Sequence, residues 1–132
     1  MTVLEIINTI YAAWGKAISK TAVKDNYSME NSTVVAQIPA ATLYFTGLPT
    51  GISTLAEGEG GVTPTIQVDI YTKGQRALTQ AYEIDEKSHE VLNGKFKFIR
   101  NYGPELNQST DPSIKRLTSR YTRIIGLGEK WK

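Results

Sequence analysis

The chain contains no cysteine and only one histidine among its 132 residues. The lack of cysteine excludes disulfide scaffolds, thiol nucleophiles and cysteine-based zinc or iron–sulfur sites. A single histidine excludes a histidine-rich metal centre. Glu5 and Lys16 interrupt the apolar N-terminal stretch, so we expect neither a membrane span nor a signal peptide. These absences favour binding or assembly over catalysis, and predict no cofactor and no bound metal.

The composition is that of a single globular domain over residues 1–132. Apolar residues make up 40% of the chain and charged residues 21%, which is enough apolar material for one core. The formal net charge of +2 hides an uneven distribution. Residues 1–66 hold 3 basic and 5 acidic side chains, whereas 9 basic and 3 acidic side chains lie from Lys95 onward. This polarity suits subunits that meet head to tail.

Apolar residues at helical spacing predict two helices, over residues 2–18 and about 74–92. Thr2 with Glu5, and Thr72 with Gln75, have the spacing of capping boxes. Asn93-Gly94 is a suitable end for the second helix. The two predicted apolar stripes are Val3, Ile6, Ile7, Ile10, Trp14, Ala17 and Ile18, then Ala77, Leu78, Ala81, Ile84, Val91 and Leu92.

Alternating apolar residues predict strands over residues 34–38, 41–46, 65–71, 95–102 and 114–125. Pro39 separates the first two of these. We predict a connector over residues 20–32 and a turn-rich loop over residues 103–112. Only one helix falls between strands, which argues against a doubly wound parallel sheet. We therefore predict an α+β fold, in which two helices pack on one face of a mostly antiparallel four- to five-stranded sheet.

The segment 47–64 is predicted to be a flexible loop. It holds five of the eleven glycines and two of the five prolines. Gly58-Glu59-Gly60-Gly61 lacks the lysine and the following helix of a phosphate-binding loop. Ile52 and Leu55 are apolar residues that a solvated loop has little reason to expose, so the segment either orders on a partner or is a mobile hairpin tip.

The last predicted strand has one basic face. Arg116 and Arg120 share it with Thr118 and Thr122, while Leu117, Tyr121 and Ile125 lie on the core side. The basic face is either an ordinary solvated sheet surface or a surface that lines a ring or contacts another subunit. We expect no aromatic residue to share this face, which disfavours single-stranded nucleic acid as a ligand.

Asp85 and His89 are one turn apart on the second predicted helix. They could form a metal pair or an oriented base, but no third ligand lies at a supporting spacing. The neighbouring charges Glu83, Glu86, Lys87 and Glu90 favour a solvated helix face, with the burial of Asp85 left open.

Several segments together resemble the small tail-terminator proteins of long-tailed bacteriophages, from about Val3 to Gly126. The resemblance lies in the pattern and order of the segments rather than in a catalytic signature. The segments are Leu43-Tyr44-Phe45 to Leu48-Pro49, Ile66 to Tyr71, Glu90-Val91-Leu92, Phe98-x-Arg100, Asp111-Pro112 and Lys115-Arg116-x-x-x-Arg120-Tyr121.

This resemblance implies a structural virion protein at the head–tail junction, present in the host cytoplasm during assembly. Such subunits form a hexameric ring, and are in some cases monomeric before assembly. The ring caps the tail tube, stops its growth and docks the head connector or stopper protein, and viral DNA passes through it. The implied ring or partner interface includes Arg100, Arg116, Arg120 and Arg123. The implied tube- or lumen-facing loop residues are Ile52, Leu55, Glu57 and Glu59.

Two alternatives remain open from the sequence. One is a head-completion or connector protein from the same assembly system. The other is a small nucleic-acid-binding module that uses the basic C-terminal strands. A hydrolase is the least favoured, because the chain offers no convincing set of catalytic residues.

Overall fold

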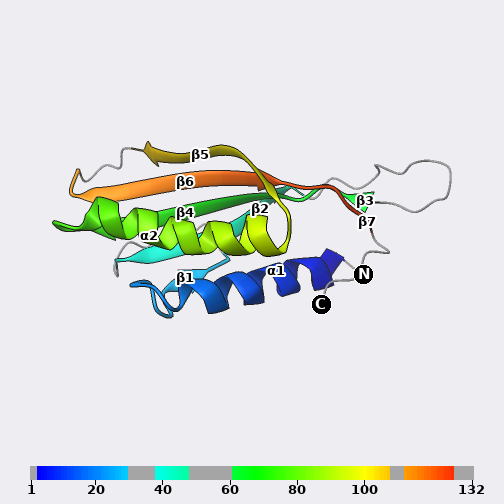
Figure 1. Cartoon of the computed structure of the whole chain (residues 1–132), viewed down its shortest axis with the longest axis horizontal. Coiled ribbons are helices and arrows are strands. Elements are labelled where there is room, and N and C mark those ends of the chain that lie inside the picture. Colours follow the sequence, from blue (N-terminus) through cyan, green and yellow to red (C-terminus); the bar gives the residue numbers. More distant parts are fainter. Residues whose placement is uncertain (1–2, 30–37, 48–60, 108–111, 127–132) are drawn as a thin grey trace.

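The computed structural model describes residues 3–29, 38–47, 61–107 and 112–126. Their centre is a five-stranded sheet in the order β1-β2-β4-β6-β5 (Figure 1). Its strands are β1 (Tyr27–Ser28), β2 (Ala40–Gly47), β4 (Thr65–Lys73), β5 (Ile99–Asn107) and β6 (Ile114–Thr122). The β1–β2 pair is parallel and the other pairs are antiparallel. The predicted α+β fold is confirmed.

A two-stranded sheet extends one end of the molecule. It pairs β3 (Gly61–Val62) with β7 (Ile125–Gly126). β7 continues the direction of β6 after a break at residues 123–124. The single strand predicted over 114–125 is therefore wrong at its C-terminal end, because the chain leaves the main sheet after Thr122.

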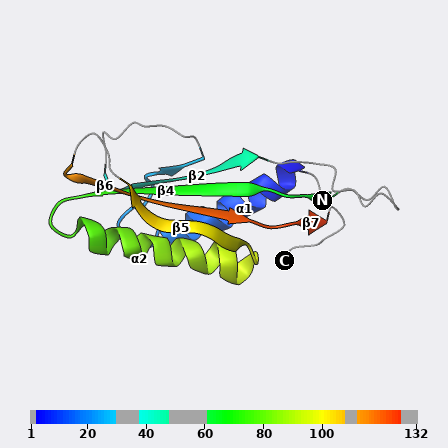
Figure 2. The same cartoon turned by 90° about the horizontal axis from the view of Figure 1, so that it is seen from above.

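Two helices cover one face of the sheet and run along its length (Figures 1 and 2). They are α1 (Val3–Ile18) and α2 (Ala77–His89), and α2 continues into the π-helical turn η1 (Glu90–Lys95). The indole Nε1 of Trp14 donates a hydrogen bond of 2.9 Å to Ser88 Oγ and so joins the two helices. Within the described part of the chain, no helix is long and apolar enough to cross a membrane.

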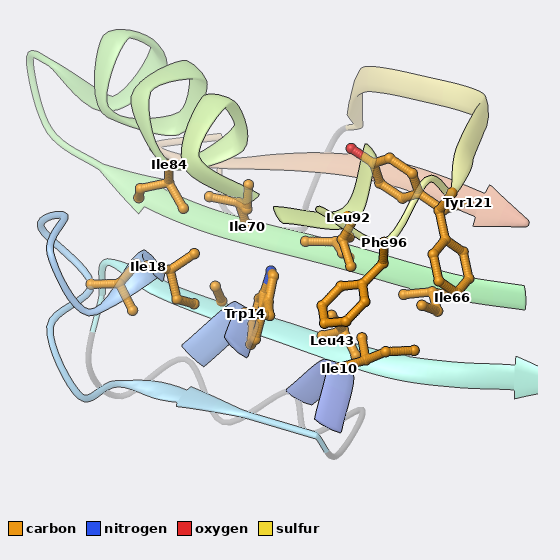
Figure 3. Packing of buried hydrophobic residues seen from close by; sticks show 14 of the residues in the cluster. Ile10, Trp14, Ile18, Leu43, Ile66, Ile70, Ile84, Leu92, Phe96 and Tyr121 are labelled. Atoms are coloured by element: carbon orange, nitrogen blue, oxygen red, sulfur yellow. The ribbon is translucent and has the colours of Figure 1, made fainter. Parts of the chain in front are cut away.

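The core lies between the helices and the sheet (Figure 3). The stripe of α1 contributes Ile6, Ile10, Trp14 and Ile18, all fully buried, as predicted. Alternate β4 residues face them: Ile66, Val68 and Ile70. Burial of each such side chain contributes about 1.5–3 kcal/mol, so this stripe-on-sheet contact is the main support of the fold.

The predicted start of the second helix is wrong. Thr72 belongs to β4, and its hydroxyl donates to the Ala77 carbonyl oxygen at 2.6 Å instead of capping the helix. Arg76 stands at the N-cap without a side-chain cap hydrogen bond. Leu78, placed in the predicted apolar stripe, is 45% exposed. The Thr2–Glu5 capping box includes Thr2, outside the described residues.

The predicted helix end at Asn93-Gly94 is also wrong. Both residues lie inside η1, and the amide of Phe96 donates to the Val91 carbonyl oxygen at 3.1 Å. The Asn93 side chain instead donates to the Phe98 carbonyl oxygen at 2.9 Å. The wider turn buries Leu92, Phe96 and Phe98 together, and this burial outweighs the local preference to stop.

Strand β5 begins at Ile99, later than the predicted 95–102, and runs through the predicted loop to Asn107. Gly103 and Pro104 lie within it, where the pairing with β6 shifts register twice. An edge strand tolerates proline because its outer amide groups need no ladder partner. Gly103 has φ +84°, and a Cβ there would collide with the Thr118 carbonyl oxygen. The predicted strand 34–38 falls almost wholly outside the described residues, and the connector 20–32 contains the short β1.

Candidate functional site

The sheet face opposite the helices carries a continuous group of polar and aromatic side chains, called here the open face. The strand registers align Tyr44 with Gln67, Thr42 with Asp69, and Tyr71 with Arg116. The open face comprises Thr42, Tyr44, Gln67, Asp69, Tyr71, Tyr102, Arg116, Thr118 and Arg120.

Asp69 lies at the centre of the open face and is fully buried. Its Oδ1 accepts hydrogen bonds from Thr118 Oγ1 at 2.6 Å and Arg116 Nε at 3.4 Å. Its Oδ2 accepts from Tyr44 Oη and from Gln67 Nε2, both at 3.1 Å. Four donors from three strands thus hold one carboxylate, as the burial of a charge requires.

The surroundings of Asp69 shift the ionisation of the neighbouring tyrosine. Burial, together with the negative charge and hydrogen bond of Asp69, raises the pKa of Tyr44 to about 12. Burial also raises the pKa of Tyr71, again with a contribution from Asp69. Both phenols therefore stay protonated at neutral pH, and that of Tyr44 donates to Asp69.

Arg120 is exposed and links two neighbours on the open face. Its Nε donates to Gln67 Oε1 at 3.0 Å, and its guanidinium carbon lies 4.7 Å from the centroid of the Tyr102 ring. The expectation that no aromatic residue lies on the basic face is correct only for the residues of β6 itself. Tyr44, Tyr71 and Tyr102 reach the same face from β2, β4 and β5, which a single-strand pattern cannot show.

A second polar group, called here the buried network, lies on the helix side of the sheet. Arg100 Nη2 donates to Asp85 Oδ1 and Oδ2 at 3.0 and 3.1 Å. Ser119 Oγ lies 3.3 Å from Asp85 Oδ1. Arg100 Nε also donates to Tyr121 Oη at 2.9 Å. The sequence leaves the burial of Asp85 open, and in the structure this carboxylate is buried, with Arg100 reaching it from the edge strand.

His89 belongs to the same network. Its Nδ1 lies 2.9 Å from Tyr121 Oη. Because Arg100 already donates to that oxygen, the phenol proton is directed to an unprotonated Nδ1. Burial and the charge of Arg100 lower the pKa of His89, while burial raises the pKa of Tyr121 to about 12. The neutral imidazole is a structural acceptor, partly removed from solvent.

The structure separates the four arginines predicted to form one interface. Arg116 and Arg120 share the open face, as the strand alternation predicts. Arg100 points to the opposite side, into the buried network, and Arg123 Nη1 donates to the Phe96 carbonyl oxygen at 2.8 Å. The predicted loop residues Ile52, Leu55, Glu57 and Glu59 lie outside the described residues. The open-face tyrosines and Asp69 are site residues that sequence reasoning missed.

The described residues contain two polar groups, the open face and the buried network. Among them, no three histidine, cysteine, aspartate or glutamate side chains are grouped to hold a metal ion. The carboxylates Asp69 and Asp85 are each engaged by arginine and hydroxyl groups. Both polar groups therefore fix strands and helices in place, and the open face in addition presents Arg120 to solvent.

No protein-family model matches the sequence, and no curated protein matches it. Among solved structures, the fold is similar to that of a chain in the structure titled "Virion of native gene transfer agent (GTA) particle". The alignment covers 87% of this chain and 92% of that chain, with a TM-score of 0.59 and 7% sequence identity. At this identity the likeness concerns the fold, which the two chains share over nearly their whole lengths.

Proposed function

We propose that this chain is a structural virion protein that caps the tail tube of a phage-like particle as a ring. The observation that carries the proposal is the fold shared with a virion chain over nearly the full length of both. The segment pattern that resembles tail terminators gives independent support, because it depends on the sequence and not on the fold comparison.

In this proposal the ring acts by geometry. Identical subunits joined by heterologous contacts close a ring with two chemically different faces. One face fits the end of the tube and the other fits the head connector or stopper, so no further tube ring can add. Viral DNA passes through the centre without sequence-specific contacts. Arg116 and Arg120 would contribute to a partner surface, whereas Arg100 and Arg123 would support it from inside the subunit.

Electron microscopy of tails assembled with and without this protein tests the proposal. We expect tubes of uneven length that do not join heads when the protein is omitted, and uniform joined tails when it is added back. Uniform tails that join heads in its absence would reject the terminator role. A head-completion protein would instead give normal tails and heads that fail to accept them.

The open face favours a second candidate, a surface for single-stranded nucleic acid. Three tyrosines and two arginines on an antiparallel sheet can stack and pair with such a strand. Binding of a labelled oligonucleotide should then weaken with salt and fall when Arg116 and Arg120 are both replaced by alanine. Arg76→Ala is the matched control, because Arg76 is an exposed arginine on the helix side.

A further inference from the structure

Five of the six exposed large apolar side chains among the described residues fall into two sets, and the sixth, Leu4, is 66% exposed on α1. Leu78, Tyr82 and Leu106 are each 45% exposed and come from the start of α2 and the end of β5. Ile99 and Ile124 are each 63% exposed and come from the start of β5 and the chain before β7. In Figure 1 the start of α2 and the end of β5 lie toward one end of the long axis, β7 lies toward the other end, and β5 begins between them.

The first set, called here the helix patch, comprises Leu78, Tyr82 and Leu106. Leu78 and Tyr82 are one helical turn apart on α2. They share a helix face with Asp85 and His89, and this face lies beside β5. Leu106 pairs in register with Leu117, a buried residue of the helix side. The exposed acids Glu83 and Glu86 follow Tyr82 along α2, and Glu83 forms an ion pair of 3.5 Å with the exposed Arg76.

The second set, called here the strand patch, comprises Ile99 and Ile124. Ile99 stands opposite Thr122 and so lies on the open-face side. Ile124 follows Thr122 by two residues, in the break between β6 and β7. The nearby exposed charges are basic: Lys95 and Lys97 immediately precede β5, and Arg120 precedes Thr122 on the same face. The two patches thus combine exposed apolar residues with charges of opposite sign.

We infer that the helix patch of one copy docks on the strand patch of the next copy, with Glu83 and Glu86 facing Lys95 and Lys97. This inference rests on the proposed ring and names the contact that closes it. A second copy of the chain is the occupant because each patch carries the charge that complements the other. Two different surfaces make a head-to-tail contact, which repeats until the ring closes.

Engineered cysteines test the contact cleanly, because the chain has none of its own. The Tyr82→Cys/Ile124→Cys double variant, incubated with tail tubes under mild oxidation, should form disulfide-linked ladders of several subunits. A mixture of the two single variants should stop at dimers, and each single variant alone should stay monomeric. Asn8→Cys/Lys20→Cys is the control pair, since both positions are exposed and lie outside the two patches.

Charge reversal gives a second measurement that does not depend on apolar substitutions. Glu83→Lys/Glu86→Lys in the double-cysteine background should lower the cross-linking yield about fivefold through like-charge repulsion. Adding Lys95→Glu/Lys97→Glu should restore it. Circular dichroism confirms that each variant is folded before the comparison.

Two results would overturn the inference. One is cross-linking of a single variant with itself, which indicates a symmetric contact. The other is a ladder no stronger than that of the control pair while the protein still caps tubes. In that second case the proposed function stands and only the contact is wrong. Ladders formed by a protein that leaves tube length unchanged would support the contact and reject the terminator role.

Discussion

Arg100 Nη2 lies 3.0 and 3.1 Å from the two carboxylate oxygens of Asp85, and so fastens the edge strand β5 to helix α2. The side chains are only 17% and 9% exposed. Arg100→Met leaves an uncompensated buried carboxylate, and we expect it to lower the free energy of unfolding by about 3–5 kcal/mol. Urea denaturation measures the change.

Two controls separate this ion pair from general effects of losing an arginine. Arg76→Met removes a solvent-exposed pair with Glu83 and should change stability by less than about 1 kcal/mol. The double variant Arg100→Met/Asp85→Leu should recover much of the lost stability, because no buried charge remains. Additive losses in the double variant would show that the two side chains are not coupled.

His89 makes stability depend on pH. Burial and Arg100 lower its pKa below the ordinary 6.5, so the unfolded chain binds a proton more readily than the folded one. The stabilisation is fully present above pH 6.5 and decreases as the pH falls toward the folded-state pKa. Urea denaturation between pH 7 and 5 should show this loss, and His89→Gln should flatten the profile. An unchanged profile in that variant would contradict the role of His89.

Asp69 raises the pKa of a tyrosine beside it. Burial is the main reason that the pKa of Tyr44 is about 12, and Asp69 adds to it by charge and by its hydrogen bond. Asp69→Asn should therefore lower the pKa of Tyr44 while leaving it above 10. Spectrophotometric tyrosine titration, with Tyr44→Phe to assign the signal, measures the shift. Asp25→Asn serves as the control, because Asp25 is exposed and lies outside the strands. A titration identical to the wild type would exclude this coupling.

Gly15 is required by packing rather than by backbone conformation. A Cβ at this position would lie 2.5 Å from Cε2 of the Tyr27 ring. Glycine to alanine within a helix ordinarily gains about 1 kcal/mol, but here we expect Gly15→Ala to destabilise by about 1–3 kcal/mol through overpacking. Gly94→Ala is the control, since a Cβ there meets open space. Thermal unfolding distinguishes the two, and Tyr27→Leu should relieve the effect of Gly15→Ala.

The hydrogen bond between Trp14 and Ser88 should be visible in fluorescence. Ser88→Ala leaves the buried indole N–H without its acceptor, at a cost of about 1–3 kcal/mol. The emission of Trp14 should shift in a Trp131→Phe background, where it is the only indole. Ser19→Ala is a control, because its hydroxyl bonds to a backbone oxygen at an exposed position. An emission and stability equal to the parent would reject the contact.

The sequence predicted best those features that depend on periodicity within one segment. The buried stripe of α1 and the inward residues of β4 were predicted because a helix or strand with one buried face repeats every 3.6 or 2 residues. Arg116 and Arg120 were placed on one face for the same reason. In each case the neighbouring elements only confirm what the segment already specifies.

Features that depend on partners far away in the chain were not predictable from one segment. The charged neighbours of Asp85 on α2 leave its burial open, and it is Arg100 and Ser119 on two other strands that bury it. Likewise, the tyrosines of the open face come together only through the strand registers. The helix does not end at Asn93-Gly94. The burial of Phe96 and Phe98 in the core stabilises the fold more than a turn at those two residues would.

The strand order has a consequence for synthesis of the chain. β6 is the last strand of the main sheet to leave the ribosome, and it lies between β4 and β5. Until its residues emerge, β5 has no neighbour in the sheet, and the carboxylate of Asp69 lacks Thr118 and Arg116. A nascent chain that stops before residue 114 therefore cannot complete the sheet, and the main sheet closes only after β6 has been synthesised.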